Sequence, residues 1–220
     1  SVSAFLLNRS SDLDLMKKIV FKAMVTVLFT IHCSLFTATA QTAKSVLDKA
    51  ASTITVKDGV KANFKMTGSH GNTSGTIFVK GKKFHATTPV ATIWFDGKTQ
   101  WTYMKNNDEV NISTPTEAQL QAINPYNFIN LYKNGYTSTL NKSGKDYIVH
   151  LTAESKSKKI QELFITVDKT SYHPTQVKLL QGNKWIIFDI TNLKKENIAD
   201  GQFKFNSKDF PNAEVIDLRG

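Results

Sequence analysis

The sequence has little of the material from which disulfide-linked or metal-held frameworks are built. Cys33 is the single cysteine in 220 residues, which excludes an intramolecular disulfide framework and any zinc or iron–sulfur site made from several cysteines. Repeats and low-complexity segments are absent as well. With 40% hydrophobic and 21% charged residues, the composition excludes a disordered chain and a bundle of membrane helices. We therefore expect a globular protein of one or two domains.

Motifs for catalysis or cofactor binding are also missing. The sequence has no Gly-x-Ser-x-Gly motif of serine hydrolases and no glycine-rich phosphate-binding loop. A triad dispersed along the chain stays compatible with the sequence. The histidines beyond residue 40 occupy four different segments, without the spacing of metal-binding pairs, at His70, His85, His150 and His173. We predict a protein that is not an enzyme and has no catalytic residue, metal or cofactor.

Acidic residues are outnumbered by basic ones, 18 to 28, which gives a formal net charge of +10. Such a balance suits an acidic protein, an anionic membrane surface or a nucleic acid. Lysines cluster at 80–83, 156–159 and 194–195, where we predict strand ends and loops. Aromatic residues are not interleaved with them, so nucleic acid is not an expected partner. We interpret the clusters as solvated turns, or as a surface for docking to an acidic transporter or an anionic membrane.

The first forty residues resemble a leader. Met16-Lys17-Lys18 begins a basic stretch, an apolar run covers 23–31, and Ala38-Thr39-Ala40 ends the segment, which are the three parts of a secretory signal peptide. We predict an upstream extension at 1–15, a signal peptide at 16–40 and a single mature domain at 41–220. An uncleaved membrane anchor and a lipid-modified Cys33 are the alternatives. A mature chain without cysteine favours the bacterial periplasm.

Apolar periodicity predicts one helix followed by many strands. Apolar residues between 43 and 54 recur at helical spacing, and cap-plus-proline signals at 114–117 and 124–125 predict two short helices that end near Ile123 and Asn134. The expected fold class is α+β, an incomplete antiparallel β-barrel of about eleven strands with helices covering its concave face. Segments with a period of two predict strands at 61–68, 75–80, 83–87, 92–95, 99–105, 110–113, 136–140, 147–153, 161–167, 175–180 and 185–193, with a last short stretch at 203–205.

Large apolar side chains are abundant on these strands. They belong either to an ordinary packed core or to a cavity that holds an apolar ligand. The residues are Phe64, Met66, Phe78, Phe84, Trp94, Phe95, Trp101, Tyr103, Phe164, Trp185 and Phe188.

Three segments, in this order and spacing, resemble LolA, the family of periplasmic outer-membrane lipoprotein carriers. The first is Gly75-Thr-Ile-Phe-Val-Lys80 with Phe84, similar to Gly-x-Leu-x-Val-Lys-Arg-Pro-x-x-Phe/Leu. The second is Asp96-Gly-Lys-Thr-Gln-Trp-Thr-Tyr103, similar to Asp-Gly-Lys-x-Leu-Trp-x-Tyr. The third is Phe203-Lys-Phe205 leading to Pro211 and Val215-Ile-Asp217, similar to Phe-x-Phe-x-x-Pro-x-Gly-x-x-Val. Together they frame nearly all of the chain from residue 41 onward.

The resemblance implies a monomeric carrier that moves acylated lipoproteins from the inner to the outer membrane. Its implied partners are a LolCDE-like ABC transporter of the inner membrane and an outer-membrane receptor. A lipid-sensing or lipoprotein-sensing module of the periplasm on the same fold is the alternative. The candidates for the acyl-binding cavity and its helical lid are Phe64, Met66, Phe78, Phe84, Trp101, Tyr103, Leu120, Ile123, Tyr126, Ile129 and Tyr132.

One position departs from the family pattern. The arginine that follows Val-Lys and hydrogen-bonds the helical lid in the family is replaced here by Gly81. Lys82 and Lys83 follow directly and are the candidates to substitute for it. Latching of the lid by that arginine is therefore not expected in this chain.

Overall fold

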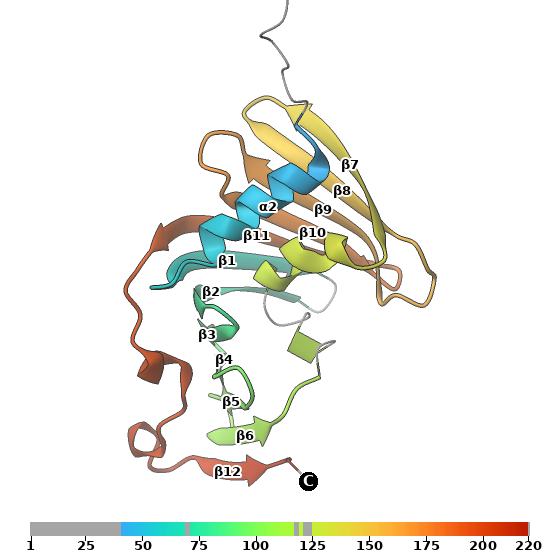
Figure 1. Ribbon diagram of the computed structural model, residues 1–220. Coiled ribbons are helices and arrows are strands. Elements are labelled where there is room, and N and C mark those ends of the chain that lie inside the picture. The colour runs from blue at the N-terminus through green and yellow to red at the C-terminus, as the bar shows by residue number, and fades with distance from the viewer. Residues whose placement is uncertain (1–40, 69–70, 117–118, 121–124, 220) are drawn as a thin grey trace, which may run out of the picture. The chain divides into compact units, whose positions relative to one another are not determined.

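The computed structural model describes residues 41–68, 71–116, 119–120 and 125–219. They belong to one compact unit, Gln41–Gly220, which is built on a single sheet (Figure 1). Its strand order is β12-β6-β5-β4-β3-β2-β1-β11-β10-β9-β8-β7. The strands are β1 (Val60–Gly68), β2 (Gly71–Lys80), β3 (Lys83–Thr87), β4 (Ala91–Phe95), β5 (Gln100–Met104), β6 (Glu109–Ser113), β7 (Tyr136–Ser143), β8 (Asp146–Ala153), β9 (Ile160–Asp168), β10 (Pro174–Gln181), β11 (Lys184–Lys195) and β12 (Glu214–Asp217).

Two antiparallel meanders make up this sheet. Strands β1 to β6 form one and β7 to β11 the other, and the antiparallel pairing of β1 with β11 joins them, with Met66 opposite Phe188. Tight turns link the neighbouring strands. At the β4–β5 turn, Asp96 Oδ1 accepts bonds from the backbone N–H groups of Lys98 and Thr99 at 3.0 and 2.8 Å, and Gly97 takes φ +103°, a conformation that favours glycine.

Helix α2 (Ala43–Ile54) starts at a capping box between Thr42 and Ser45, in which each side chain accepts a bond from the other's backbone N–H. Such a box satisfies backbone donors that have no partner within the helix. The buried side of α2 belongs to the main hydrophobic core, and the helix contacts β7, β8 and the 3-10 helix η1 (Pro125–Lys133). The prediction of a helix from Ala43 to about Ile54 is confirmed.

The two faces of the sheet follow from its register. Phe84 lies opposite Phe95, and the same side of the sheet carries Phe188; we call this the inner face. On the outer face Phe78 lies opposite His85 and His85 opposite Trp94. The C-terminal segment, with 3-10 helices η2 (Asp200–Phe203) and η3 (Ser207–Asp209), packs on the outer face near β3 and β4 before it ends in β12.

Several sequence predictions need correction. The sheet is not entirely antiparallel, because β12 pairs with β6 in parallel, although its twelve strands in the described residues are close to the expected number of about eleven. The stretch 203–205 is not a strand, since Phe203 ends η2 and the last strand follows at Glu214. The segment at 125–134 is helical but adopts the tighter 3-10 form. Of the helix expected to end near Ile123, only Gln119 and Leu120 are described in helical conformation, and Ile123 lies outside the described residues.

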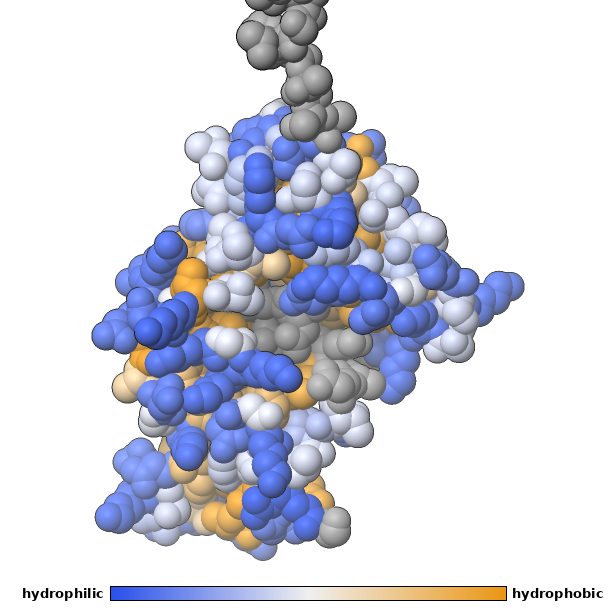
Figure 2. All heavy atoms as spheres, in the orientation of Figure 1, coloured by the Kyte–Doolittle hydropathy of each residue, from blue (hydrophilic) through white to orange (hydrophobic). Residues whose placement is uncertain are grey.

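Most of the face seen in Figure 2 is hydrophilic, with hydrophobic atoms visible near the middle and at the bottom of the view. Within the part of the chain that the structure describes, no helix is long and apolar enough to cross a membrane.

Candidate functional site

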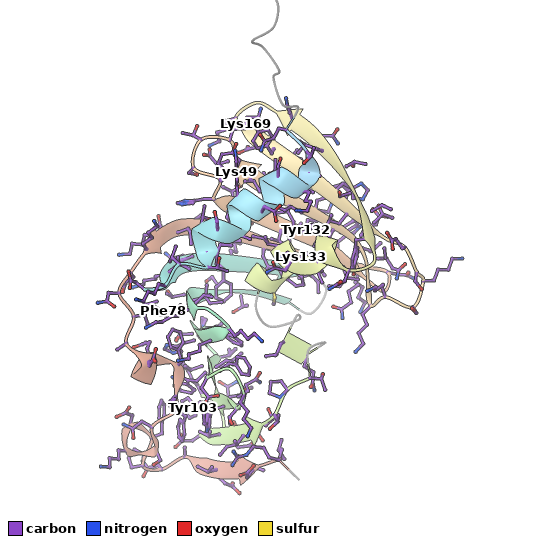
Figure 3. The ribbon with its side chains drawn as sticks, viewed as in Figure 1. Lys49, Phe78, Tyr103, Tyr132, Lys133 and Lys169 are labelled. Atoms are coloured by element: carbon purple, nitrogen blue, oxygen red, sulfur yellow. The ribbon has the colours of Figure 1, made fainter. Side chains whose placement is uncertain are left out.

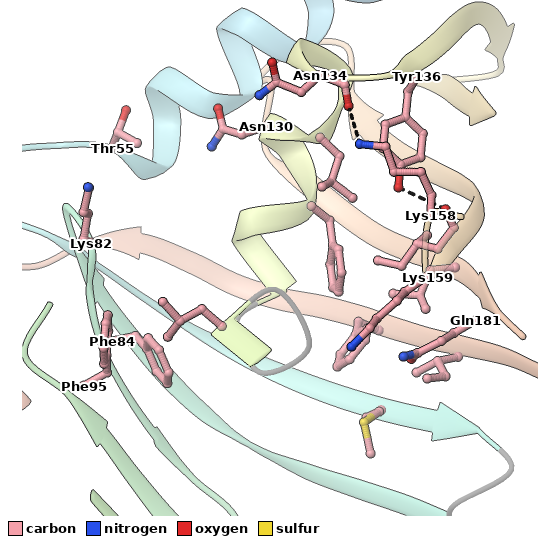
Figure 4. A pocket seen from close by; sticks show the side chains of 18 of the residues that line it. Thr55, Lys82, Phe84, Phe95, Asn130, Asn134, Tyr136, Lys158, Lys159 and Gln181 are labelled. Atoms are coloured by element: carbon pink, nitrogen blue, oxygen red, sulfur yellow. Dashed lines mark hydrogen bonds between the residues drawn. The ribbon is translucent and has the colours of Figure 1, made fainter. Parts of the chain in front are cut away.

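A pocket of about 830 Å³ lies between η1 and the inner face of the sheet (Figure 4). Its volume falls in the range of about 300 to 1,000 Å³ typical of sites for small ligands. Strands β1, β3, β4, β10 and β11 provide one wall, η1 and Leu120 the other, and the β8–β9 loop closes one end. The residues that line it are Thr55, Met66, Gly81, Lys82, Phe84, Phe95, Gly97, Leu120, Phe128, Asn130, Leu131, Asn134, Tyr136, Ser157, Lys158, Lys159, Ile160, Leu179, Gln181, Ile186 and Phe188.

The wall on the sheet side is apolar and rigidly packed. Phe84 and Leu179 are 1% and 2% exposed, and the rings of Phe84 and Phe95 lie 5.4 Å apart. From the opposite wall, the ring of Phe128 comes within 6.0 Å of Phe188. Side chains this deeply buried are closely packed against their neighbours. This region can hold a hydrocarbon group.

The rim of the pocket is polar and positively charged. Lys82, Lys158 and Lys159 line it, and no aspartate or glutamate occurs among the described lining residues. Lys158 Nζ donates to the backbone carbonyl of Asn134 at 3.2 Å and lies 5.4 Å from the ring centroid of Tyr136. The Tyr136 hydroxyl in turn donates to the carbonyl of Ile160 at 3.0 Å, so these contacts join the C-terminal end of η1 to the β8–β9 loop (Figure 4).

Helix η1 is held on its other side by α2. The Tyr132 hydroxyl donates to Asp48, whose carboxylate also pairs with Lys44 at 2.8 Å. The hydrogen bonds from Lys44 and Tyr132 lower the pKa of Asp48. Partial burial and the bond to Asp48 raise the pKa of Tyr132 to about 12, so the hydroxyl stays a donor at neutral pH.

The two lysines that could replace the family arginine have different surroundings. Lys83 pairs with Asp200 at 3.1 Å, as does Lys80, and both are thereby bonded to the C-terminal segment. Lys82 lines the pocket. Gly81 has φ +60° in the β2–β3 turn, a left-handed conformation that an arginine would adopt only with strain. Among the described residues, Asp48 bonds the side chain of Tyr132 in η1, and Lys158 bonds the carbonyl of Asn134 just after it.

The structure brings only some of the sequence candidates to the pocket. Met66, Phe84 and Leu120 line it. Ile129 is 1% exposed and belongs to the packed core, against which Phe64 and Tyr132 also lie. Tyr126 belongs to η1 but its side chain is not among those described, and Ile123 lies outside the described residues.

Phe78, Trp101 and Tyr103 lie on the outer face, away from the pocket. Trp101 is opposite Trp94 in the register; Phe78 stacks on His85 with centroids 5.6 Å apart; Tyr103 packs against Phe210 at 4.6 Å. Figure 3 shows Phe78 and Tyr103 in the lower half of the sheet, apart from η1 and its Tyr132. Of the three, Tyr103 contacts the C-terminal segment directly, through Phe210.

Other pocket residues were not among the candidates. Phe95 and Phe188 were recognised only as large apolar residues, and Ile186 and Leu179 were not singled out, although they alternate with outward-facing neighbours. Phe128 and Leu131 belong to a segment whose apolar residues surround most of an α-helix, so α-helical periodicity could not separate its core side from its pocket side. In the observed 3-10 form, residues three apart align, and positions 127, 130 and 133 make one polar side.

The described lining of the pocket lacks the side chains that most often bind metal ions. Histidine, cysteine, aspartate and glutamate are all absent from the described lining. Elsewhere in the described ranges, no group of three such residues is arranged to hold a metal ion. The chemistry available at this site is burial of apolar groups, with lysine and amide donors at the rim.

An open, mostly antiparallel sheet of this kind, with a pocket against its inner face, is an incomplete β-barrel. A family model described as outer membrane lipoprotein carrier protein LolA matches residues 33–183. The chain therefore belongs to the LolA family, as the sequence motifs predict.

Comparison with solved structures finds distant matches, of which the first supports the fold. An uncharacterized conserved protein from Thermus thermophilus is 13% identical, with a TM-score of 0.55 over 80% of this chain and 99% of that chain. A LolA superfamily protein from Nitrosomonas europaea is 16% identical, with a TM-score of 0.42 over 76% of this chain and 99% of the other. The MucA/MucB complex of Pseudomonas aeruginosa contains a chain that is 14% identical, with a TM-score of 0.42 over 76% of this chain and 62% of that chain. No curated protein sequence matches the chain.

Proposed function

We propose that the protein is a periplasmic carrier that binds acyl chains of lipoproteins in the pocket between η1 and the sheet. The observation that supports this most is the pocket itself, whose sheet-side wall is made of buried apolar side chains such as Phe84, Leu179 and Phe188. Membership of a family described by lipoprotein carriage supports the choice of ligand. On this proposal, α2 and η1 cover the concave face of the half-barrel and η1 acts as the lid.

The size of the pocket suits a ligand that must be released. Each buried methylene contributes about 0.8 kcal/mol, so one sixteen-carbon chain contributes roughly 12 kcal/mol. Three fully buried chains would pass the practical affinity limit of about 18 to 21 kcal/mol. A pocket of about 830 Å³ is in the range of drug-sized ligands, and we expect it to enclose part of a triacylated anchor.

The proposed route begins at an ABC transporter of the inner membrane, LolCDE-like in its role, and ends at the outer membrane, where a receptor accepts the cargo. The chain enters this route after removal of residues 1–40, and the domain 41–220 acts as a monomer. No chemical step is required of the carrier. Binding and release depend on the opening of η1, which can move without breaking the hydrogen bonds of the sheet.

Two adjacent isoleucines of β11 allow a matched test. Ile186 lines the pocket, whereas Ile187 is opposite Lys178 on the outer face, and both are half-buried. Ile186→Asp places a charge in the apolar wall, where an unpaired charge costs several kcal/mol. We expect it to weaken binding of a fluorescent triacylated lipopeptide at least tenfold, with Ile187→Asp close to wild type. Fluorescence titration measures the binding, and thermal melting checks that both variants fold.

Transfer of the same lipopeptide from donor to acceptor vesicles separates a carrier from a sensing module. A carrier accelerates this transfer in proportion to its concentration, whereas a sensor binds the lipopeptide and does not. Equal loss of binding in the Ile186 and Ile187 variants, or a wild-type protein that binds no lipopeptide, would rule out the pocket as the acyl site.

A further inference from the structure

Three segments that are distant in sequence meet at one end of the strands. Gln181 at the end of β10 pairs with Ile160 at the start of β9, and Tyr136 at the start of β7 pairs with Ala153 at the end of β8. The β8–β9 loop, the β10–β11 hairpin and the C-terminal end of η1 therefore lie side by side. Figure 1 shows both loops projecting at the right of the view.

This end of the sheet carries five lysines and an exposed tryptophan, and we call it the basic end. Glu154 is the one acidic residue between 153 and 160, and 131–136 and 181–186 contain none. Glu162, farther along β9, lies 3.3 Å from His150. The residues of the basic end are Lys133, Lys156, Lys158, Lys159, Lys184 and Trp185. None of the ion pairs between described residues involves one of these lysines.

Trp185 is unusual because it is a large apolar side chain left in solvent. It is 36% exposed, with Lys178 Nζ 4.3 Å from its ring centroid on the outer face and the ring of Phe164 6.0 Å away. Tryptophan favours the boundary between lipid and water, because its ring is apolar and its indole N–H is polar. Lysines beside it are attracted to anionic lipid headgroups.

The pocket also reaches this end, since Ser157, Lys159 and Gln181 line it and are exposed. Lys82 also lines the pocket and is exposed, and none of the ion pairs between described residues includes it, although its neighbours Lys80 and Lys83 share Asp200. Among the described lining, lysines without an ion pair thus occur at both places, but only the end at the β8–β9 loop has several of them together with the exposed Trp185 nearby.

We propose that the basic end docks onto an anionic lipid bilayer, with Trp185 at the headgroup level and the lysines over the lipid phosphates. Docking in this orientation presents the end of the pocket at Lys158 and Lys159 to the membrane. The inference goes beyond the proposed carriage, because docking requires charge and an aromatic ring but no occupied pocket.

Two triple variants of equal charge test the proposal. Lys133, Lys156 and Lys184 belong to the basic end without lining the pocket, whereas Lys142, Lys145 and Lys195 lie at the opposite ends of their strands. Partition of the protein onto membranes is measured by sedimentation with phosphatidylcholine vesicles. The vesicles contain about 30% phosphatidylglycerol, an anionic share on the order of that in natural anionic membranes. We expect replacement of the first three lysines by glutamine to lower partition about a hundredfold, since each lysine near the surface contributes roughly a factor of five. The second triple should stay near wild type.

The protein is used as it is exported and recovered from a bacterial host. All variants share the same N-terminal residues, so any contribution of that segment cancels in the comparison. Trp185→Phe is assayed on vesicles with brominated acyl chains, where we expect the fluorescence quenching of the wild type to disappear. Equal losses in the two triples, no preference for anionic over neutral vesicles, or quenching that survives Trp185→Phe would each overturn the proposal. Lipopeptide binding by the first triple, measured without membranes, reports separately on the proposed carriage.

Discussion

His85, on the outer face, is a histidine whose pKa is far from its ordinary value. It lies between Phe78 and Trp94, with ring centroids 5.6 and 5.4 Å away, and its Nδ1 accepts a bond from Gln202 at 2.8 Å. Burial lowers the pKa of His85 to about 4. A neutral imidazole fits this surrounding, because Nδ1 must be unprotonated to accept the bond from Gln202, while Nε2–H can donate to the Thr87 hydroxyl at 3.2 Å.

The lowered pKa predicts loss of stability in mild acid. The unfolded chain takes up a proton at His85 below about pH 6.5, whereas the folded protein does so only near pH 4, so the free energy of unfolding decreases as the pH falls through this window. At 1.36 kcal/mol per pKa unit, we expect a loss of about 2 kcal/mol between pH 7 and pH 5 from this group. Urea unfolding at the two pH values measures it.

Replacement of the ring supplies the control. His85→Phe keeps an aromatic ring in the stack but removes the titration, so the difference between pH 7 and pH 5 should shrink by about 2 kcal/mol. His173→Gln removes a histidine outside the stack and should leave the difference at its wild-type value. A His85→Phe protein with the full wild-type pH dependence would contradict the assignment.

At the scale of elements, η1 depends on a few bonds to its neighbours. The Tyr132 hydroxyl ties it to Asp48 of α2, and Asn134 at its end accepts the bond from Lys158. A short 3-10 segment has poor hydrogen-bond geometry of its own. Its position is therefore set by these contacts and by the burial of Phe128 and Ile129.

Tyr132→Phe should loosen η1 without disturbing the sheet. Loss of one hydrogen bond at a partly exposed carboxylate costs about 1 kcal/mol, which corresponds to roughly fivefold faster amide exchange within 125–134 and faster release of a bound lipopeptide. Hydrogen exchange measured by mass spectrometry resolves this segment from the strands.

The matched control is Tyr172→Phe. Tyr172 also contacts α2, where Lys49 Nζ donates to its hydroxyl at 3.2 Å, but it belongs to the β9–β10 connection and bonds nothing in η1. Removal of the Tyr172 hydroxyl should leave the rate of amide hydrogen exchange in η1 unchanged. If both variants speed exchange equally, the Asp48 bond is not what holds η1.

Sequence patterns predict where strands lie along the chain better than they predict which face of the sheet each side chain occupies. A period of two locates β3 at residues 83–87, as observed, because alternation depends only on local neighbours. It could not assign Tyr103 to the outer face, because both faces of β4 and β5 carry large apolar side chains, and Phe205 and Phe210 of the C-terminal segment pack on the outer one. Phe78 is likewise on an outer face that is aromatic, since it stacks on His85. When both faces are apolar, alternation no longer distinguishes inside from outside.

At the scale of the whole described unit, long-range pairing decides the architecture. The β1–β11 pair brings Phe64 opposite Ile190, and β12 pairs with β6 across about a hundred residues of chain. Local periodicity carries no information on such partners, which is why the parallel β12 was missed and the pocket lining was only partly anticipated. The resemblance of three short motifs supplied what periodicity could not, namely the family.

The N-terminal prediction concerns the whole molecule and has a direct test. Ala38 and Ala40 provide the small residues that signal peptidase requires on either side of one unrestricted position, so the exported protein should begin at Gln41. Cleavage there leaves the capping box of Thr42 and Ser45 intact at the start of α2. Intact-mass measurement of exported protein should give residues 41–220. Ala40→Leu should block processing and retain the chain at the membrane, whereas Thr39→Leu, at the unrestricted position, should be processed normally. A wild-type chain that keeps Lys17 and Lys18 would contradict cleavage, and with it a freely diffusing carrier.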